Sequence, residues 1–153
     1  MVVLVDTNIL IAITSRRSPG YPDVEAAVKI LRQQNTQLVI SSQNAIEYWA
    51  VCTRPAEHNG FGLSIERAQN ELSYIERNYS VIKDLPAVYE AWRGLVSSHE
   101  ISGRQVHDAR LIAVMLVYGI DRILTLNGAD FRRFADIGIS VLTPALLVSA
   151  NIT

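Results

Sequence analysis

The sequence contains a single cysteine, which excludes a small protein held together by disulfides and one built around a cysteine–histidine metal site. Cys52 has no second cysteine with which to form an internal disulfide, and no cysteine or histidine partners at the spacing of a metal site. We therefore expect a protein of a reducing compartment, the cytoplasm, in which Cys52 is a small buried apolar residue.

A charge bias and a long apolar run are also missing. The 14 basic and 15 acidic residues leave a formal net charge of -1, so a nucleic-acid partner would require a local basic patch. Residues 1–13 are mostly apolar, but this stretch is too short to cross a bilayer, lacks a basic flank and contains Asp6 and Asn8. We expect neither secretion nor a membrane partner.

Hydrophobic residues are abundant. They make up 49% of the 153 residues, enough for one well-filled core, and no linker-like stretch divides the chain, so we expect a single domain, residues 1–153. Apolar segments alternate with stretches of helical periodicity, and the expected strands are 2–5, 37–40, 79–82, 122–126 and 139–142. This order predicts an α/β fold, a three-layer α/β/α sandwich around a mainly parallel central sheet.

Polar side chains follow the predicted strands. The first strand ends abruptly at Asp6, with Asn8 two residues later, and ligands of such sheets bind outside the carboxyl ends of the strands. We expect the same edge to collect four more polar side chains, from strand ends or from the early turns of helices: Glu47, Asp108, Asn127 and Asp130.

Each of three acids also has a purely structural interpretation. Asp6, or its neighbour Thr7, is a good helix N-cap, and Glu47 is a candidate for an exposed helical residue. Asp108 near the start of a helix interacts favourably with the helix dipole. The local patterns leave these alternatives open.

Two further local patterns concern the helices that carry these acids. Ile46, Trp49, Ala50 and Thr53 predict the buried stripe of a helix that Pro55 ends, with Glu47 just off that stripe. The segment from Ser102 to Gln105 has the spacing of a capping box for the helix that contains Asp108.

Carboxylates gathered at one edge repel one another. Two unit charges 4 Å apart cost about 4 kcal/mol at an effective dielectric constant near 20, so such groups share protons or hold a divalent cation. Ligands that are all oxygen favour Mg²⁺ or Mn²⁺ over zinc. The cluster suits phosphoryl chemistry, in which metal ions activate water and neutralise the departing oxygen.

Three strings together resemble the PIN domain, in the branch of VapC-type toxins of bacterial toxin–antitoxin pairs. The first is Asp6-Thr7-Asn8-Ile9-Leu10, the second runs from Ala45 to Pro55, and the third is GRQVHDARLIAVMLVYGIDRILTLNGADFRRF, residues 103–134. They follow in the family's order over essentially the whole chain. The resemblance implies a Rossmann-like sheet and a Mg²⁺- or Mn²⁺-dependent endoribonuclease, in which metal-activated water cuts RNA and leaves a 5′-phosphate.

The resemblance also assigns roles to residues. Asp6, Glu47 and Asp108 match the family's first three acids, which implies that they are catalytic and hold metal directly or through water, with Asp6 and Asp108 as the direct ligands. In the fourth motif the usual Thr-any-Asp is Thr125-Leu126-Asn127, so an amide stands where a carboxylate is common. Asp130 is the candidate for the missing catalytic charge.

The remaining candidates lie around those acids. We expect Asn8, Thr125 and Asn127 to orient the carboxylates. Candidates for contact with RNA phosphates are arginines, because guanidinium binds phosphate oxygens bidentately: Arg16, Arg17 and Arg104 first, then Arg110, Arg132 and Arg133. The implied partners are an RNA (tRNA, rRNA or mRNA), a cognate VapB-type antitoxin and a second copy of the chain.

Three other interpretations of the sequence make different demands on its residues. A haloacid-dehalogenase-like phosphatase needs an acid two residues after Asp6, where this sequence has Asn8. A receiver domain needs a late lysine, whereas the only lysines are Lys29 and Lys83. The alternative from another class is a catalytically weakened PIN module that binds RNA or protein, disabled by Asn127.

Overall fold

Five short strands form one parallel sheet in the computed structural model, which describes residues 1–150; the last three residues of the predicted domain lie outside the described part. The strand order is β3-β2-β1-β4-β5, and every pairing is parallel. The strands are β1 (Val2–Val5), β2 (Gln37–Ser41), β3 (Ser80–Ile82), β4 (Arg122–Leu124) and β5 (Ser140–Leu142). The predicted parallel sheet is confirmed, with β1 at its centre.

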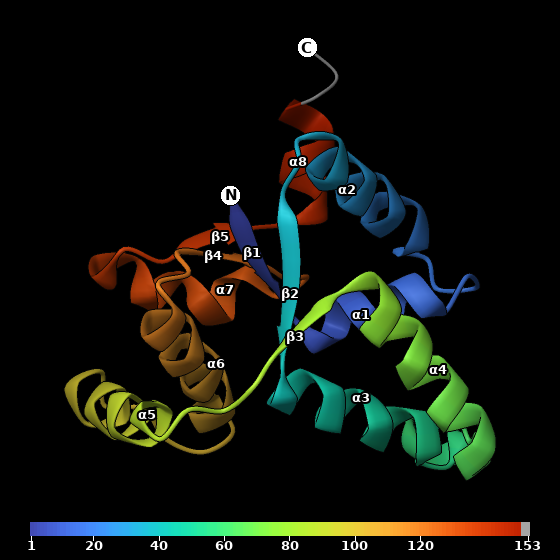
Figure 1. Ribbon diagram of the computed structural model, residues 1–153, viewed down its shortest axis with the longest axis horizontal. Helices are drawn as coiled ribbons and strands as arrows, with labels where there is room; N and C mark the ends of the chain where they lie inside the picture. Colours follow the sequence, from blue (N-terminus) through green and yellow to red (C-terminus); the bar gives the residue numbers. More distant parts are fainter. Residues whose placement is uncertain (151–153) are drawn as a thin grey trace.

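Helices cover both faces of this sheet, which gives the predicted three layers (Figure 1). One layer contains α1 (Thr7–Thr14), α2 (Tyr21–Gln33), α3 (Ser42–Thr53), α4 (Ile65–Asn78) and α8 (Pro144–Ala150). The other contains α5 (Ala87–Ser98), α6 (Gln105–Tyr118), α7 (Gly128–Phe131) and the 3-10 segment η2 (Arg132–Ile137). A second 3-10 segment, η1 (Ala56–His58), follows α3.

The central strand is apolar because both of its faces are covered. Val3 and Val5 pack in the core shared with α1, α2, α3 and α4, whereas Leu4 packs in the core shared with α5 and α6. All three residues are fully buried. A strand buried on both faces reads as a continuous apolar run, which is why its first polar residue, Asp6, marks the edge of the sheet.

The chain passes from β1 directly into α1, with Asp6 as the N-cap residue of that helix. The backbone N–H of Asp6 donates to the carbonyl of Leu124 at the end of β4, and the N–H of Thr125 donates to Leu142 at the end of β5. The carboxyl ends of β1, β4 and β5 therefore meet at one edge. No helix within residues 1–150 has the length and apolar character needed to cross a membrane.

Two local predictions are wrong. The buried side of α3 carries Gln43, Asn44, Tyr48 and Cys52, while Ile46 is 68% exposed. The polar Gln43 and Asn44 face inward because they have hydrogen-bond partners there, a case that hydrophobic periodicity does not detect. The prediction of a buried Cys52 is confirmed.

The predicted capping box does not form either. The N-cap residue of α6 is Arg104, which makes no side-chain cap bond. Gly103 has a positive φ of +59°, so the backbone turns sharply there and the helix begins only at Gln105. Asp108 consequently lies in the first turn of α6.

Candidate active site

Asp6 is held by three donors at the carboxyl edge of the sheet. Its Oδ1 accepts a hydrogen bond from the backbone N–H of Thr7 at 2.7 Å. Its Oδ2 accepts from Asn8 Nδ2 at 2.8 Å and from Thr125 Oγ1 at 2.7 Å. Only 8% of the residue is exposed. Asp6 is therefore both the N-cap of α1 and a fixed carboxylate, so the two interpretations of the sequence are compatible.

Asn8 and Thr125 lock each other as well as Asp6. Asn8 Nδ2 also donates to Thr125 Oγ1 at 3.1 Å, and Asn8 Oδ1 accepts from the backbone N–H of Leu126 at 3.0 Å. Asn8 thereby joins the start of α1 to the chain after β4. The expected orienting contacts of Asn8 and Thr125 with a carboxylate are present in the structure; a role in catalysis stays a prediction.

Burial and neighbouring acids perturb the Asp6 carboxyl. The pKa of Asp6 is raised from 3.8 to about 6. Removal from water is the largest cause, the charges of Glu47 and Asp108 add to the increase, and the bonds from Thr125 and Thr7 oppose it. Asp6 thus lies within electrostatic range of both other candidate acids. A protonation change close to neutral pH is common at functional sites.

Glu47 is fixed through both of its carboxylate oxygens. Thr7 Oγ1 donates to Glu47 Oε2 at 2.6 Å, and Gln43 Nε2 donates to Oε1 at 2.8 Å. Thr7 is held in turn by Asn44 Nδ2 at 3.1 Å. Glu47 is therefore not a freely exposed helical residue, because Thr7, Gln43 and Asn44 determine its position, and of these the sequence patterns single out only Thr7, as a cap.

Gln43 and Asn44 could have been found from their spacing in the sequence. Gln43 precedes Glu47 by four residues, so the two side chains are neighbours on one helical face. Asn44 forms a capping box with Ser41, which explains a fully buried amide. Polar residues on the inward face of a helix beside an acid are therefore worth testing as part of the same site.

Asp108 and Asp130 lie on two helices of the other layer, within electrostatic range of each other. Burial raises the pKa of Asp108, and the charges of Asp130 and Glu47 add to the increase, while Arg133 opposes it. Asp130 lies in the first turn of α7 and is exposed. Asn127, the N-cap residue of α7, makes no side-chain cap bond; its backbone N–H donates to Thr125 Oγ1 at 3.0 Å. An orienting contact of the Asn127 side chain is therefore not seen.

The four acids are coupled electrostatically but are not a ready-made metal cage. Within residues 1–150, no group of three His, Cys, Asp or Glu side chains is positioned to hold a metal ion. Mg²⁺ keeps several of its waters and is commonly bound by only one or two carboxylates with substrate phosphate. Asp6 and Asp108 fit that requirement, because they are oxygen donors whose pKa values are raised first by burial and then by the charges of other carboxylates.

Two of the candidate arginines lie on the same side as the acids. Arg104 occupies the N-cap position of the helix whose first turn contains Asp108, and the charge of Arg133 lowers the pKa of Asp108. The neighbouring Arg132 is exposed. Cations here would meet the phosphates of a polyanion that approaches the acids.

Three other candidates are placed differently. Arg16 and Arg17 follow the far end of α1, and eight helical residues span about 12 Å. Arg110 is engaged by the protein itself, since its Nη2 lies 2.9 Å from Asp84 Oδ1 and its Nη1 donates to Gln43 Oε1 at 3.1 Å. Arg16 and Arg17 are therefore remote from Asp6, and Arg110 has protein partners.

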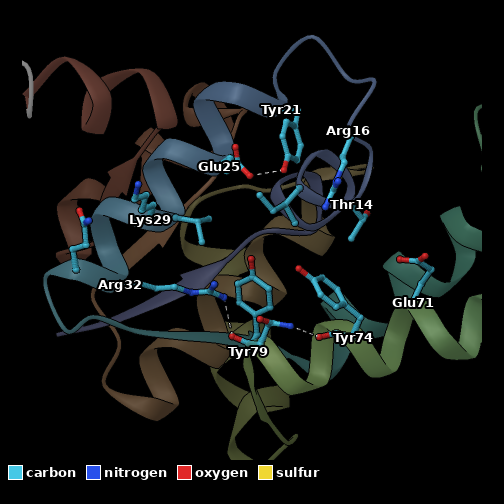
Figure 2. A pocket seen from close by; sticks show the side chains of 13 residues that line it. Thr14, Arg16, Tyr21, Glu25, Lys29, Arg32, Glu71, Tyr74 and Tyr79 are labelled. Carbon is cyan, nitrogen blue, oxygen red and sulfur yellow. Dashed lines mark hydrogen bonds between the residues drawn. The ribbon is translucent and has the colours of Figure 1, made fainter.

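A separate hollow lies at the far end of α1 (Figure 2). Its volume is about 790 Å³, and its lining includes Tyr21, Arg16, Lys29, Tyr74 and Tyr79. Tyr21 from α2 and Tyr79 after α4 point toward each other across it. Glu25 and Glu71 line it as well, and neither Asp6 nor Asp108 is among its lining residues.

A fixed carboxylate at the carboxyl edge of a parallel sheet, with Glu47 and Asp108 in its electrostatic field, defines an α/β protein with an acidic strand-end site. The PIN domain family profile matches residues 3–137. The chain belongs to the PIN domain family. No curated protein matches the chain in a sequence comparison.

Solved structures share this fold at low sequence identity. VapBC-1 from nontypeable Haemophilus influenzae aligns with a TM-score of 0.70 and 16% identity, over 95% of this chain and 99% of that chain. A toxin–antitoxin complex from Klebsiella pneumoniae gives 0.61 and 24%, over 93% and 97%. Mycobacterium tuberculosis VapC20, described as a sarcin-ricin loop cleaving toxin, gives 0.61 and 20%, over 90% and 96%. These likenesses confirm the predicted fold class.

Proposed function

We propose that this chain is a divalent-metal-dependent endoribonuclease, a VapC-type toxin that a VapB-type antitoxin inhibits. The observation that carries the proposal is Asp6, a buried carboxylate fixed by three donors and faced by Glu47 and Asp108 at the strand edge of a PIN domain. VapC20, which shares the fold, is described as an RNA-cleaving toxin. RNA hydrolysis is accordingly the reaction that this site supports best.

Each acid has a task in this proposal. Asp6 and Asp108 would hold Mg²⁺ or Mn²⁺, and the cation would supply water activation and neutralise charge on the phosphate. Thr125 and Asn8 keep the Asp6 carboxylate in one orientation. Glu47, fixed by Thr7 and Gln43, adds negative charge beside that pair, and Asp130 adds charge beside Asp108.

The experiment is hydrolysis of purified tRNA, rRNA and mRNA by the wild-type chain with Mg²⁺ or Mn²⁺, with EDTA as control. Asp6→Asn and Asp108→Asn prepared in parallel show whether the activity belongs to this protein. We expect cleavage of at least one RNA class that depends on metal and on both aspartates. Cleavage that survives EDTA or either substitution would contradict the proposal.

The antitoxin proposal rests on the structural neighbours and on the tyrosine-lined hollow. VapBC-1 and the Klebsiella protein are toxin–antitoxin complexes. The hollow adjoins α1, whose other end carries Asp6, so a segment seated there would run toward the acids.

Expression of this chain in a bacterial host should arrest growth, and co-expression of the adjacent small gene should restore it. Tyr74→Ala should weaken that rescue without changing RNA cleavage; unimpaired rescue would remove the hollow from the interface.

We also propose that the chain forms homodimers. Large apolar side chains are exposed on α3, on the segment that leads into α5 and on α5 itself: Ile46 at 68%, Leu85 at 44% and Tyr89 at 59%. Burying such side chains against a second copy would remove them from water. Light scattering should give twice the chain mass, and Ile46→Glu should lower it; a monomeric wild type would contradict this part.

The second candidate is a PIN module that binds RNA or protein without cutting. It is favoured by the exposed Asn127, which contributes no carboxylate, and by the absence of a three-ligand acidic group within residues 1–150. RNA binding without hydrolysis, at saturating Mn²⁺, would select this candidate.

A further inference from the structure

Gln43 crosses from one layer of the sandwich to the other at the edge that carries the acids. It lies in the first turn of α3, and only 8% of it is exposed. Its Nε2 donates to Glu47 Oε1 at 2.8 Å and to the backbone carbonyl of His107 at 3.0 Å. The first partner is on α3 itself, and the second is on α6, directly before Asp108 in the chain.

Position 43 requires a side chain with both donors and an acceptor, and the amide of Gln43 has both. Its two N–H groups serve Glu47 and His107, and its oxygen accepts from Arg110 Nη1 at 3.1 Å. A carboxylate would have no donor for Glu47, and an apolar side chain would have neither donor nor acceptor. Gln43 thus uses donors and acceptor together within a part-buried site.

Arg110 holds the amide oxygen of Gln43 in place. Arg110 projects from α6, and its guanidinium also pairs with Asp84 at 2.9 Å, on the segment that leads into α5. The guanidinium therefore fixes which way the amide points, with its N–H groups toward Glu47 and His107. The connection runs from Asp84 through Arg110 and Gln43 to Glu47.

This connection matters because Glu47 and Asp108 stand on helices of different layers. The inward side chains of α3, Tyr48 and Cys52, pack in one core, whereas the buried residues of α6 pack in the other. Gln43 is the side chain that bonds the Glu47 carboxylate and the α6 backbone at once. The distance between the two acids is thus linked to one amide.

We propose that Gln43 is a positioning residue that holds the Glu47 carboxylate and fixes its spacing from Asp108, with Arg110 orienting Gln43. The inference rests on the proposed nuclease function. Loss of such orienting contacts typically costs 10- to 100-fold in activity. Gln43→Leu, which keeps side-chain bulk and removes the amide, should therefore lower kcat about 10- to 100-fold and leave the KM for RNA nearly unchanged.

A double-mutant cycle separates positioning from a general loss of stability. Gln43→Leu, Glu47→Gln and the double variant are compared with the wild type in kcat and in urea unfolding. If Gln43 acts through Glu47, the double variant is about as slow as the slower single variant. If the two losses multiply, Gln43 acts independently of Glu47 and the inference is overturned.

Two further variants keep the test decisive. Arg110→Met is at a partly exposed position, so it tests the same connection if Gln43→Leu fails to fold. A lower kcat with an unchanged KM supports orientation of Gln43, whereas a raised KM alone would make Arg110 an RNA contact and overturn its assigned role. Gln69→Leu on the exposed face of α4 is the matched control and should match the wild type.

The outcomes also distinguish this inference from the proposed function. A wild-type chain that hydrolyses no RNA overturns both. Metal-dependent hydrolysis by the wild type that Gln43→Leu and Arg110→Met both retain in full leaves the nuclease proposal standing and overturns the positioning role alone.

Discussion

Replacing Asp6 by asparagine removes a charge that the folded protein holds at a cost. The pKa of Asp6 is raised from 3.8 to about 6, chiefly by burial. The folded chain therefore binds a proton at Asp6 more readily than the unfolded chain does, and ionisation of Asp6 destabilises the fold. At 1.36 kcal/mol per pKa unit this cost is about 3 kcal/mol. It is fully present above pH 6, shrinks as the pH falls toward 3.8, and is absent below.

Asparagine removes the cost of this charge but loses hydrogen bonds. It still serves as an N-cap, because its Oδ1 accepts from Thr7. Its amide nitrogen, however, cannot accept from Asn8 and Thr125, and each lost bond costs about 1 kcal/mol. At pH 7.5 we therefore expect Asp6→Asn to be about 1 kcal/mol more stable than the wild type. At pH 4.5, where the ionisation cost is only about 1 kcal/mol, it should be about 1 kcal/mol less stable.

The assay is urea unfolding followed by circular dichroism at pH 7.5 and 4.5, in EDTA so that no cation offsets the charge. Asp121→Asn is the control, because the Asp121 side chain is 67% exposed and its substitution should change little at either pH. An advantage of Asp6→Asn that stays the same at both pH values would refute the reasoning, since burial of the charge would then cost nothing.

The remaining predictions concern the groups around Asp6. Thr125→Val removes the hydroxyl donor to Asp6 and should cost about 2 kcal/mol in urea unfolding at pH 7.5 and less at pH 4.5, because bonds to a charged group are stronger; an equal loss at both would contradict this. Asn127→Asp should tighten Mn²⁺ binding without RNA in calorimetric titration, because a carboxylate offsets cation charge and an amide does not; unchanged affinity would leave Asn127 outside the site. Asp130→Ala should lower RNA cleavage much less than Asp6→Asn does, since Asp130 is exposed and acts through its charge on Asp108; equal losses of cleavage would make Asp130 a ligand.

The sheet was predictable because apolar runs and their polar ends are local signals. Each predicted strand is found, and Asp6 lies where the first one ends. The strand after Arg122 ends at Leu124, two residues earlier than predicted, and the backbone N–H of Leu126 donates to Asn8 Oδ1 rather than to a neighbouring strand. Leu126, an apolar residue that extends the pattern, is 44% exposed.

The inner face of α3 was not predictable from hydrophobicity. Gln43 and Asn44 are buried through partners on α6 and α1, which lie far away in the sequence. A count of apolar residues assigns the buried stripe to Ile46 instead. Whether a polar side chain is buried depends on donors and acceptors that only the folded chain brings near.

The most direct test of the central claim is the chemistry of the RNA ends. A labelled single-stranded RNA is incubated with Mn²⁺ and either the wild type or Asp108→Asn, and the product termini are identified. Hydrolysis by metal-activated water predicts 5′-phosphate ends from the wild type and none from Asp108→Asn or in EDTA. Products ending in a 2′,3′-cyclic phosphate, or 5′-phosphate ends made equally by Asp108→Asn, would contradict it.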